Sequence, residues 1–178
     1  MVVTFAGGPT GAWSVESIRP VTGESLPAIA RLSVVEDAEV PISHDGWALR
    51  GVTSNTRYTT RSEVTALTAI QQGLGRAEAT RAALIPIRKN EAWWALAQDE
   101  RRAILETRSK HIAVGLEYLP AVARRLHHSR ELGEPFDFLT WFEYAPAHAA
   151  AFEALVDRLR RTEEWQYVDR EVDIRLAR

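Results

Sequence analysis

The stretch AVARRLHHSRELGEPFDFLTWFEY, residues 121–144, decides the fold. Residues 121–130 and 136–144 are rich in the branched and aromatic side chains that favour strands. Residues 131–134, ELGE, lie between them and have the composition of a turn. The stretch therefore predicts two consecutive strands joined by a short turn.

A helical pattern precedes this pair of strands, and a second one follows it. Residues 90–119 carry apolar side chains at helical spacing, with Asn90 suited to cap the start and Pro120 to end the segment. We expect a single break in this segment, near residues 98–99. Residues 146–161 predict the second helix.

Two further strands are predicted outside these helices. Residues 82–89 form a β-type run, and residues 167–176, YVDREVDIRL, alternate between apolar and charged side chains. From residue 82 onward the expected order is therefore β-α-β-β-α-β. That order is typical of the ferredoxin-like fold.

The first part of the chain is also rich in β-type sequence. Residues 12–20 and 47–60 predict strands, residues 21–44 are irregular, and Ser62 opens a helix that ends at the glycines of residues 73–75. We interpret residues 1–81 as a degenerate ferredoxin-like half and residues 82–178 as the second half. Together they predict one structural domain of the α+β class, an α+β barrel with helices outside the sheets.

Composition limits the function classes. The formal net charge of −2 gives no basic surface for nucleic acid or for an anionic membrane. The chain has no cysteine, which excludes disulfides, thiolate metal sites and a cysteine nucleophile. No signal peptide or membrane-spanning run is evident, so we expect a soluble, cytoplasmic protein.

Several polar side chains fall on faces that the apolar pattern directs inward. Arg124 shares a strand face with Val122 and Leu126, and Lys89 ends the apolar face of residues 82–89. Arg170 shares a strand face with apolar neighbours, and His111 lies on an inward helical stripe. Buried cations are costly without anionic or metal-bound partners, so we expect these four side chains to converge on a polar interior.

Each of these residues also has an ordinary structural interpretation. A lone histidine on an apolar stripe is more often a hydrogen-bonded core residue, and Arg124 could form a buried salt bridge or extend to the sheet edge. Trp93 and Trp94 are typical of a helix core, and the pair at residues 163–164 is typical of a solvated helix end. No zinc-protease motif, phosphate loop, dinucleotide-binding turn or nucleophile elbow occurs.

Four longer motifs carry a resemblance to a known family. They are AALIPIRKNEAWW (82–94), SKHIAVGLEYLPAVARRL (109–126), ELGEPFDFLTWFEYAP (131–146) and EEWQYVDREVDIRL (163–176). Together they resemble the chlorite dismutase family of heme b enzymes over residues 11–176. The chain length and the GAWS start (11–14) are similar to the short, dimeric branch, which implies a homodimer with one heme b per chain.

The resemblance assigns roles on one side of the heme. His111 matches the proximal ligand of the heme iron. Glu164 matches the carboxylate that hydrogen-bonds this histidine, and Lys89 matches the lysine that completes the network. A carboxylate at this place makes the histidine a stronger electron donor to the iron.

The resemblance also assigns the opposite side. Arg124 matches the distal arginine, so that it and the proximal ligand would face opposite sides of one porphyrin. Gln71 matches the glutamine that holds this arginine in one of its positions. The remaining matches, to the heme-contacting wall, are Trp94, Ile87 and Tyr58.

The activity implied by the resemblance is conversion of the small anion chlorite to chloride and dioxygen, by oxygen-atom transfer to iron and O–O bond formation. Two alternatives stay open: a coproheme decarboxylase of heme synthesis, and a heme-binding protein without turnover. Arg124 argues against the decarboxylase, because those relatives lack the distal arginine. A peroxidase of the dye-decolourising type would need a distal aspartate, and a heme-free barrel would leave the inward-facing cations without a partner.

Overall fold

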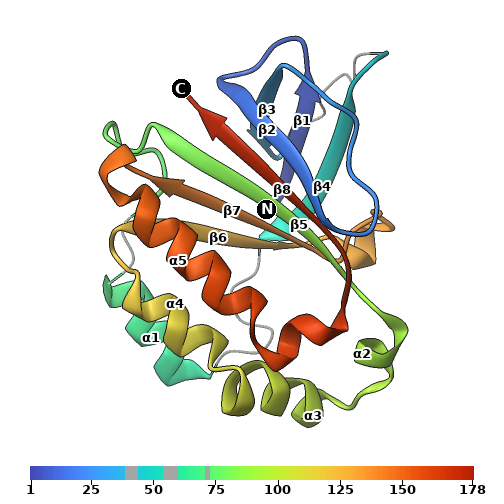
Figure 1. The fold of residues 1–178 in the computed structure, drawn as a ribbon, viewed down its shortest axis with the longest axis vertical. Helices are drawn as coiled ribbons and strands as arrows, with labels where there is room; N and C mark the ends of the chain where they lie inside the picture. Colours follow the sequence, from blue (N-terminus) through green and yellow to red (C-terminus); the bar gives the residue numbers. More distant parts are fainter. Residues whose placement is uncertain (39–43, 54–59, 71–72) are drawn as a thin grey trace.

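The computed structural model describes residues 1–38, 44–53, 60–70 and 73–178, without the side chains of residues 67 and 68. The described residues form eight strands that close into an antiparallel barrel in the order β1-β3-β2-β8-β5-β7-β6-β4 (Figure 1). The strands are β1 (Val2–Gly8), β2 (Trp13–Thr22), β3 (Arg31–Glu36), β4 (Trp47–Thr53), β5 (Arg81–Lys89), β6 (Val122–His128), β7 (Phe138–Tyr144) and β8 (Val168–Ala177). This confirms the predicted mixed class and the barrel.

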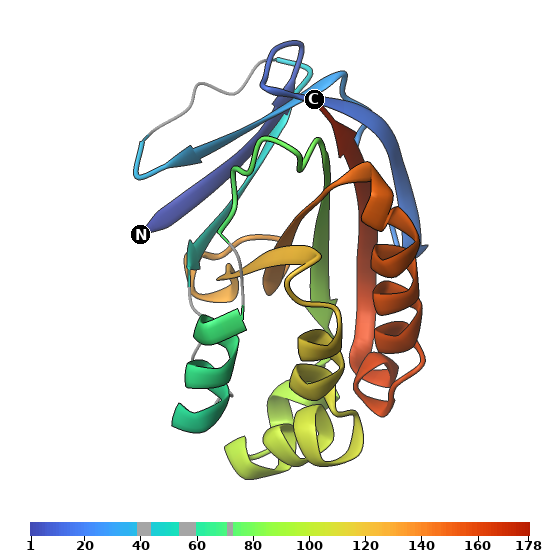
Figure 2. The same cartoon turned by 90° about the vertical axis from the view of Figure 1, so that its left-hand side faces the viewer.

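The helices lie on one side of the strands β5 to β8, and strands β1, β3 and β4 lie on the other (Figures 1 and 2). They are α1 (Arg61–Ile70), α2 (Glu91–Ala95), α3 (Gln98–Arg102), α4 (His111–Glu117) and α5 (Ala149–Arg160). A π-helical segment η1 (Ala103–Arg108) and the 3-10 turns η2 (Arg130–Leu132), η3 (Pro146–His148) and η4 (Glu163–Tyr167) complete the described elements. Among the described helices, none is long and apolar enough to cross a membrane.

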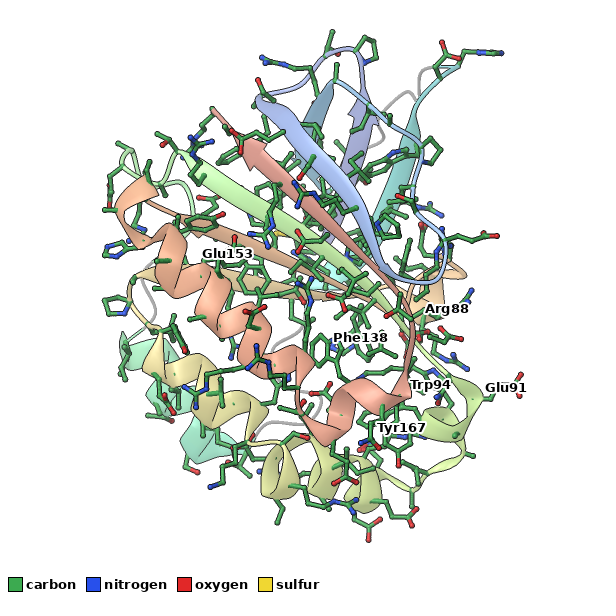
Figure 3. All side chains as sticks on the ribbon, in the orientation of Figure 1. Arg88, Glu91, Trp94, Phe138, Glu153 and Tyr167 are labelled. Carbon is green, nitrogen blue, oxygen red and sulfur yellow. The ribbon has the colours of Figure 1, made fainter. Side chains whose placement is uncertain are left out.

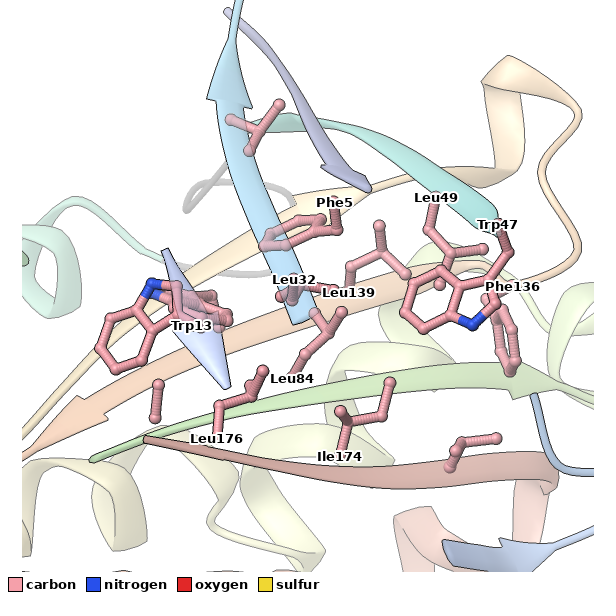
Figure 4. Close-up of a cluster of buried hydrophobic side chains, with 14 residues drawn as sticks. Phe5, Trp13, Leu32, Trp47, Leu49, Leu84, Phe136, Leu139, Ile174 and Leu176 are labelled. Atoms are coloured by element: carbon pink, nitrogen blue, oxygen red, sulfur yellow. The ribbon is translucent and has the colours of Figure 1, made fainter. Parts of the chain in front are cut away.

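Two apolar clusters occupy the two faces of this sheet. One fills the barrel, and its members include Phe5, Trp13, Leu84, Trp141 and Ile174 (Figure 4). The other lies between the sheet and the helices; it includes Ile85, Val114, Val122, Phe142 and Phe152. These strands are covered on both faces and have no solvent-facing side. Alternate side chains along each strand therefore point into two different buried clusters.

Strand β6 shows the consequence. Arg124 pairs with Phe142, on the face toward the helices, and Arg125 pairs with Trp141, on the barrel face. The prediction that Arg124 faces inward is confirmed. On the barrel face His127 is only 1% exposed and packs edge-on against Phe5, whereas Arg125 is 31% exposed.

The long helical segment is broken more often than predicted. Helix α2 ends at Ala95, α3 continues into the π-helical η1, and Ser109 and Lys110 separate η1 from α4. Lys110 adopts a left-handed conformation with φ of 52°. This conformation is unfavourable for a residue with a side chain. The Glu106 carboxylate stabilises the start of α4 by accepting the amide hydrogen of Ile112 at 2.8 Å.

The N-terminal strands were predicted less completely. The segment 21–44, expected to be irregular, contains β3, and β1 was not predicted. The strand expected over 47–60 ends at Thr53 as β4, and residues 54–59 lie outside the described part of the chain.

Candidate functional site

The candidate site lies between the helices and the sheet face that carries Ile87, Lys89 and Arg124. Lys89 ends β5, where a bulge between Arg88 and Lys89 shifts the register against β8. His111 is the first residue of α4, and Glu164 lies in the turn η4. The amide of Asn90 donates to the carbonyl of Tyr167 at 2.8 Å, which fixes the end of β5 against η4.

Lys89, Glu164 and His111 form a hydrogen-bonded triad, in which the His111 side chain is 24% exposed. Lys89 Nζ donates to Glu164 Oε1 at 2.8 Å, and the other carboxylate oxygen lies 2.7 Å from His111 Nδ1. The side chains of Lys89 and Glu164 are 3% and 6% exposed. Glu164 is therefore not the solvated helix end that its sequence context suggests, whereas its neighbour Glu163 is half-exposed and pairs with Arg108.

The triad keeps Glu164 ionised and sets which nitrogen of His111 carries the proton. Burial by itself would raise the pKa of the Glu164 carboxyl, but the charges of Lys89 and His111, with hydrogen bonds from both, lower that pKa to about 2. An ionised carboxylate only accepts hydrogen bonds, so the proton of a neutral His111 ring lies on Nδ1. Within the described part of the chain, Nε2 has no hydrogen-bond partner, which leaves its lone pair free to bind a metal.

Arg124 reaches α4 one turn beyond His111. A Cβ atom built on Gly115 would lie 2.7 Å from Arg124 Nη1 and 2.9 Å from Cζ, so the guanidinium packs directly on the glycine backbone. Burial lowers the pKa of Arg124, opposed by the negative charge of Glu106. Arginine nevertheless stays charged at any working pH.

The predicted convergence holds for three of the four inward-facing side chains. Lys89, His111 and Arg124 lie on the helix side of the sheet. Arg170 does not: its Nε donates to the carbonyl of Glu24 at 2.9 Å, and its guanidinium lies 4.5 Å from the ring centroid of Phe136 in the barrel cluster. The bulge in the pairing of β5 with β8 separates Val168, which faces the helices, from Val172, which faces the barrel.

The expected wall residues lie at the edge of this site. Ile87 is 8% exposed and belongs to the helix-side cluster. Trp94 stacks on Phe138 with ring centroids 6.1 Å apart (Figure 3). Gln71 and Tyr58 lie outside the described residues.

Two residues that position the site were not predicted. Asp137 is buried; its Oδ2 accepts from the Lys89 amide at 2.7 Å and from Trp94 Nε1 at 3.2 Å. Ser109 Oγ accepts from the Glu164 amide at 3.0 Å. An acidic residue between two phenylalanines was the available signal for Asp137, whereas a serine near a helix break gives none.

The chain matches known proteins along most of its length. The chlorite dismutase family model matches residues 29–178. The dimeric chlorite dismutase of Nitrobacter winogradskyi is similar, with 62% sequence identity, a TM-score of 0.92 and 99% of each chain covered. A chlorite dismutase of Candidatus Nitrospira defluvii, in complex with imidazole, shares the fold at 22% identity and a TM-score of 0.69, over 99% of this chain and 90% of that one.

A curated relative gives a shorter match. The chlorite dismutase of Ideonella dechloratans is 36% identical over 84 residues, which are 47% of this chain and 27% of that protein. This match therefore spans little more than a quarter of the relative's length. Because the family model covers most of the chain and the full-length similarity is high, this chain belongs to the chlorite dismutase family.

Proposed function

We propose that this chain is a heme b enzyme that converts chlorite to chloride and dioxygen. The observation that carries the proposal is the Lys89–Glu164–His111 triad, with the Arg124 guanidinium one helical turn away. Family membership supports the same activity.

The residues present fit a heme. The described residues contain no group of three or more histidine, aspartate or glutamate side chains that could hold a metal ion. A metal bound at His111 would therefore need its other ligands from a larger group, as a porphyrin supplies them. Gly115 contributes by leaving room for the Arg124 guanidinium against α4, one turn beyond His111. When bound, the heme supplies the iron to which chlorite gives up an oxygen atom.

Glu164 and Lys89 would act through His111. The carboxylate holds the proton at Nδ1, which directs the Nε2 lone pair to the metal and increases the basicity of the ligand. Lys89 keeps this carboxylate ionised in a buried place. Ile87, Trp94 and Tyr58 would contact the cofactor, and Gln71 would hold Arg124 in one of its positions.

Arg124 would bind the anionic substrate and the anion that is formed from it. A permanent guanidinium charge binds chlorite by charge-assisted hydrogen bonds, in a site where burial strengthens the attraction. The same charge would retain the chlorine–oxygen anion left by the first step until the oxygen–oxygen bond has formed. Retention limits the escape of a strong oxidant.

Three further properties belong to the proposal. The dimeric state of the Nitrobacter winogradskyi relative supports a homodimer, and we keep a cytoplasmic location as a prediction. The strand orders β4-β1-β3-β2 and β8-β5-β7-β6 support two ferredoxin-like halves, because each half pairs its strands in the order fourth, first, third, second. The first half has no helices between its strands in the described residues, in keeping with a degenerate copy.

The test is oxygen evolution after adding chlorite to heme-loaded protein. Oxygen should appear in proportion to the occupancy of the Soret band. Arg124→Ala should keep heme but lose about 10²-fold or more in kcat/KM. Arg125→Ala is the matched control, because Arg125 lies on the opposite face of β6, pairs with Glu36 at 2.6 Å and should leave activity unchanged.

His111→Ala tests the cofactor. Heme retention should fall, and a histidine-ligated ferric spectrum should disappear; persistence of that spectrum would refute the ligand assignment. No oxygen from fully loaded wild-type protein would refute the dismutase proposal. Decarboxylation of coproheme would then identify the first alternative, and stable heme without either reaction the second.

A further inference from the structure

The imidazole of His111 has a second neighbour besides Glu164. The indole of Trp165 stacks on it, with ring centroids 6.3 Å apart and 17° between the planes. Trp165 directly follows Glu164 in η4. One short turn therefore presents both the carboxylate that accepts from the ring edge and a flat surface parallel to the ring.

The indole is itself held in place. Trp165 Nε1 donates to Glu171 Oε2 at 2.8 Å. The other oxygen of Glu171 accepts from Arg160 Nε at 2.8 Å, and Arg160 Nη2 also donates to Asp173 at 2.8 Å. These contacts connect η4 to α5 and β8.

Burial makes this arrangement rigid. Glu171 is 0% exposed, and a buried carboxylate is tolerated only when both oxygens are paired. Here one oxygen needs Arg160 and the other needs the indole N–H. Rotation of Trp165 would leave a buried charge incompletely paired, so the indole has one favoured orientation.

A hydrogen bond at Nδ1 alone leaves the imidazole plane loosely defined. The χ2 torsion of histidine is broad, and a ring can pivot about its single hydrogen bond. Parallel packing against a fixed aromatic ring removes this freedom. Lys89 Nζ lies 5.5 Å from the centroid of the Trp165 ring and makes a cation–π contact with it.

We propose that Trp165, fixed by Glu171 and Arg160, is a positioning residue that sets the plane of the His111 ring. The effect on the protein itself needs no cofactor. The consequence for a bound iron rests on the proposed function: the ring plane would set the orientation in which His111 holds the iron, and thereby the symmetry of its surroundings.

The first test uses heme-free protein, so that its result does not depend on heme binding. Nuclear Overhauser contacts of the His111 ring protons, mapped first in the wild-type protein, report the orientation of the ring. In Trp165→Leu these contacts should change or average over several orientations. In Trp165→Phe, which keeps a flat face but loses the bond to Glu171, the change should be smaller.

Trp47→Phe is the control. Trp47 Nε1 donates to the Pro27 carbonyl at 3.0 Å in the barrel, so this variant also loses one indole hydrogen bond but does not contact His111. It should leave the His111 contacts unchanged. Unchanged contacts in folded Trp165→Leu would overturn the proposal; if that variant does not fold, an unchanged pattern in Trp165→Phe would do so.

Heme-loaded protein gives the second readout. In Trp165→Leu the ferric electron paramagnetic resonance signal should change its rhombic splitting, and kcat should fall about tenfold. KM for chlorite should stay the same, because Arg124 is untouched. An unchanged splitting would overturn the consequence for the iron, whereas failure of wild-type protein to bind heme would refute only the proposed function.

Discussion

Glu164→Gln tests the energetics of the triad directly. The substitution keeps the shape of the side chain but removes the charge that lies 2.8 Å from Lys89 Nζ. At an effective dielectric constant of about 20, two unit charges at this distance attract by roughly 6 kcal/mol. Removing one partner of a buried pair costs about 3–5 kcal/mol, because the other charge stays buried without compensation.

Two features of the structure place the expected loss toward the lower part of that range. The ammonium of Lys89 lies 4.6 Å from the ring centroid of Trp93, and this contact is worth about 0.5–2 kcal/mol. Lys89 Nζ also donates to the Glu164 carbonyl at 3.3 Å, which the substitution keeps. We therefore expect a loss of about 3 kcal/mol in the free energy of unfolding.

The double variant Lys89→Met with Glu164→Gln separates the charge effect from other losses. It leaves no unpaired charge, so its free energy of unfolding should lie closer to wild type than the sum of the two single losses. Urea unfolding of heme-free protein measures all four corners of this cycle. A coupling of about 2 kcal/mol or more is expected.

The control is an exposed pair. Glu153 lies 2.6 Å from Arg175 and is 58% exposed, so Glu153→Gln should cost only about 0–1 kcal/mol. Figure 3 shows Glu153 on helix α5, away from Tyr167, which ends the η4 turn that carries Glu164. If Glu164→Gln cost no more than this control, the description of the triad as a mutually dependent unit would be refuted.

The remaining predictions concern stability. Burial, then the charges of Arg125 and His128, lower the pKa of His127 from 6.5 to about 4, so the unfolded chain binds more protons between these values. The contribution of His127 to the free energy of unfolding is fully present above pH 6.5 and falls by about 3 kcal/mol as the pH drops to about 4. His127→Gln should remove this pH dependence in urea titrations. His44→Gln, a substitution at an exposed histidine, should leave it unchanged. Asn90 Oδ1 accepts the Trp93 amide at 3.0 Å, so Asn90→Ala should cost about 1 kcal/mol and Asn90→Asp much less, measured by thermal unfolding.

Sequence reasoning succeeded where one local rule determines the structure. β-type composition, with alternation in the last strand, predicted β5 to β8, and Asn90 was correctly identified as a helix cap. It failed where the backbone conformation depends on a specific side-chain contact that leaves no pattern in the sequence. The break before α4 depends on a left-handed Lys110 and on the Glu106 carboxylate that accepts the following amides, and neither has a periodic signature.

The apolar pattern of the sequence identifies some residues of the site and misses others. His111, Lys89 and Arg124 could be identified because each interrupts an apolar pattern, which marks a polar group facing inward. Glu164 could not be identified by pattern, since it stands beside Glu163 in a polar turn. Only the resemblance to the family distinguished the two. The structure supplies the physical reason: the η4 turn directs one carboxylate to Arg108 and the other to the triad.

Arg170 shows the limit of counting parity along a strand. A bulge shifts the register once, and every residue beyond it changes face. The bulge beside Lys89 turns Val168 to the helices and leaves Arg170 beside the barrel cluster, so Lys89 and Arg170 face different interiors. Lys89 keeps the helix-side face that alternation along β5 assigns to it, and there its ammonium meets the Glu164 carboxylate. An extra residue in β8 thus defeats the prediction for Arg170, whereas regular alternation along β5 accounts for the place of Lys89 in the triad.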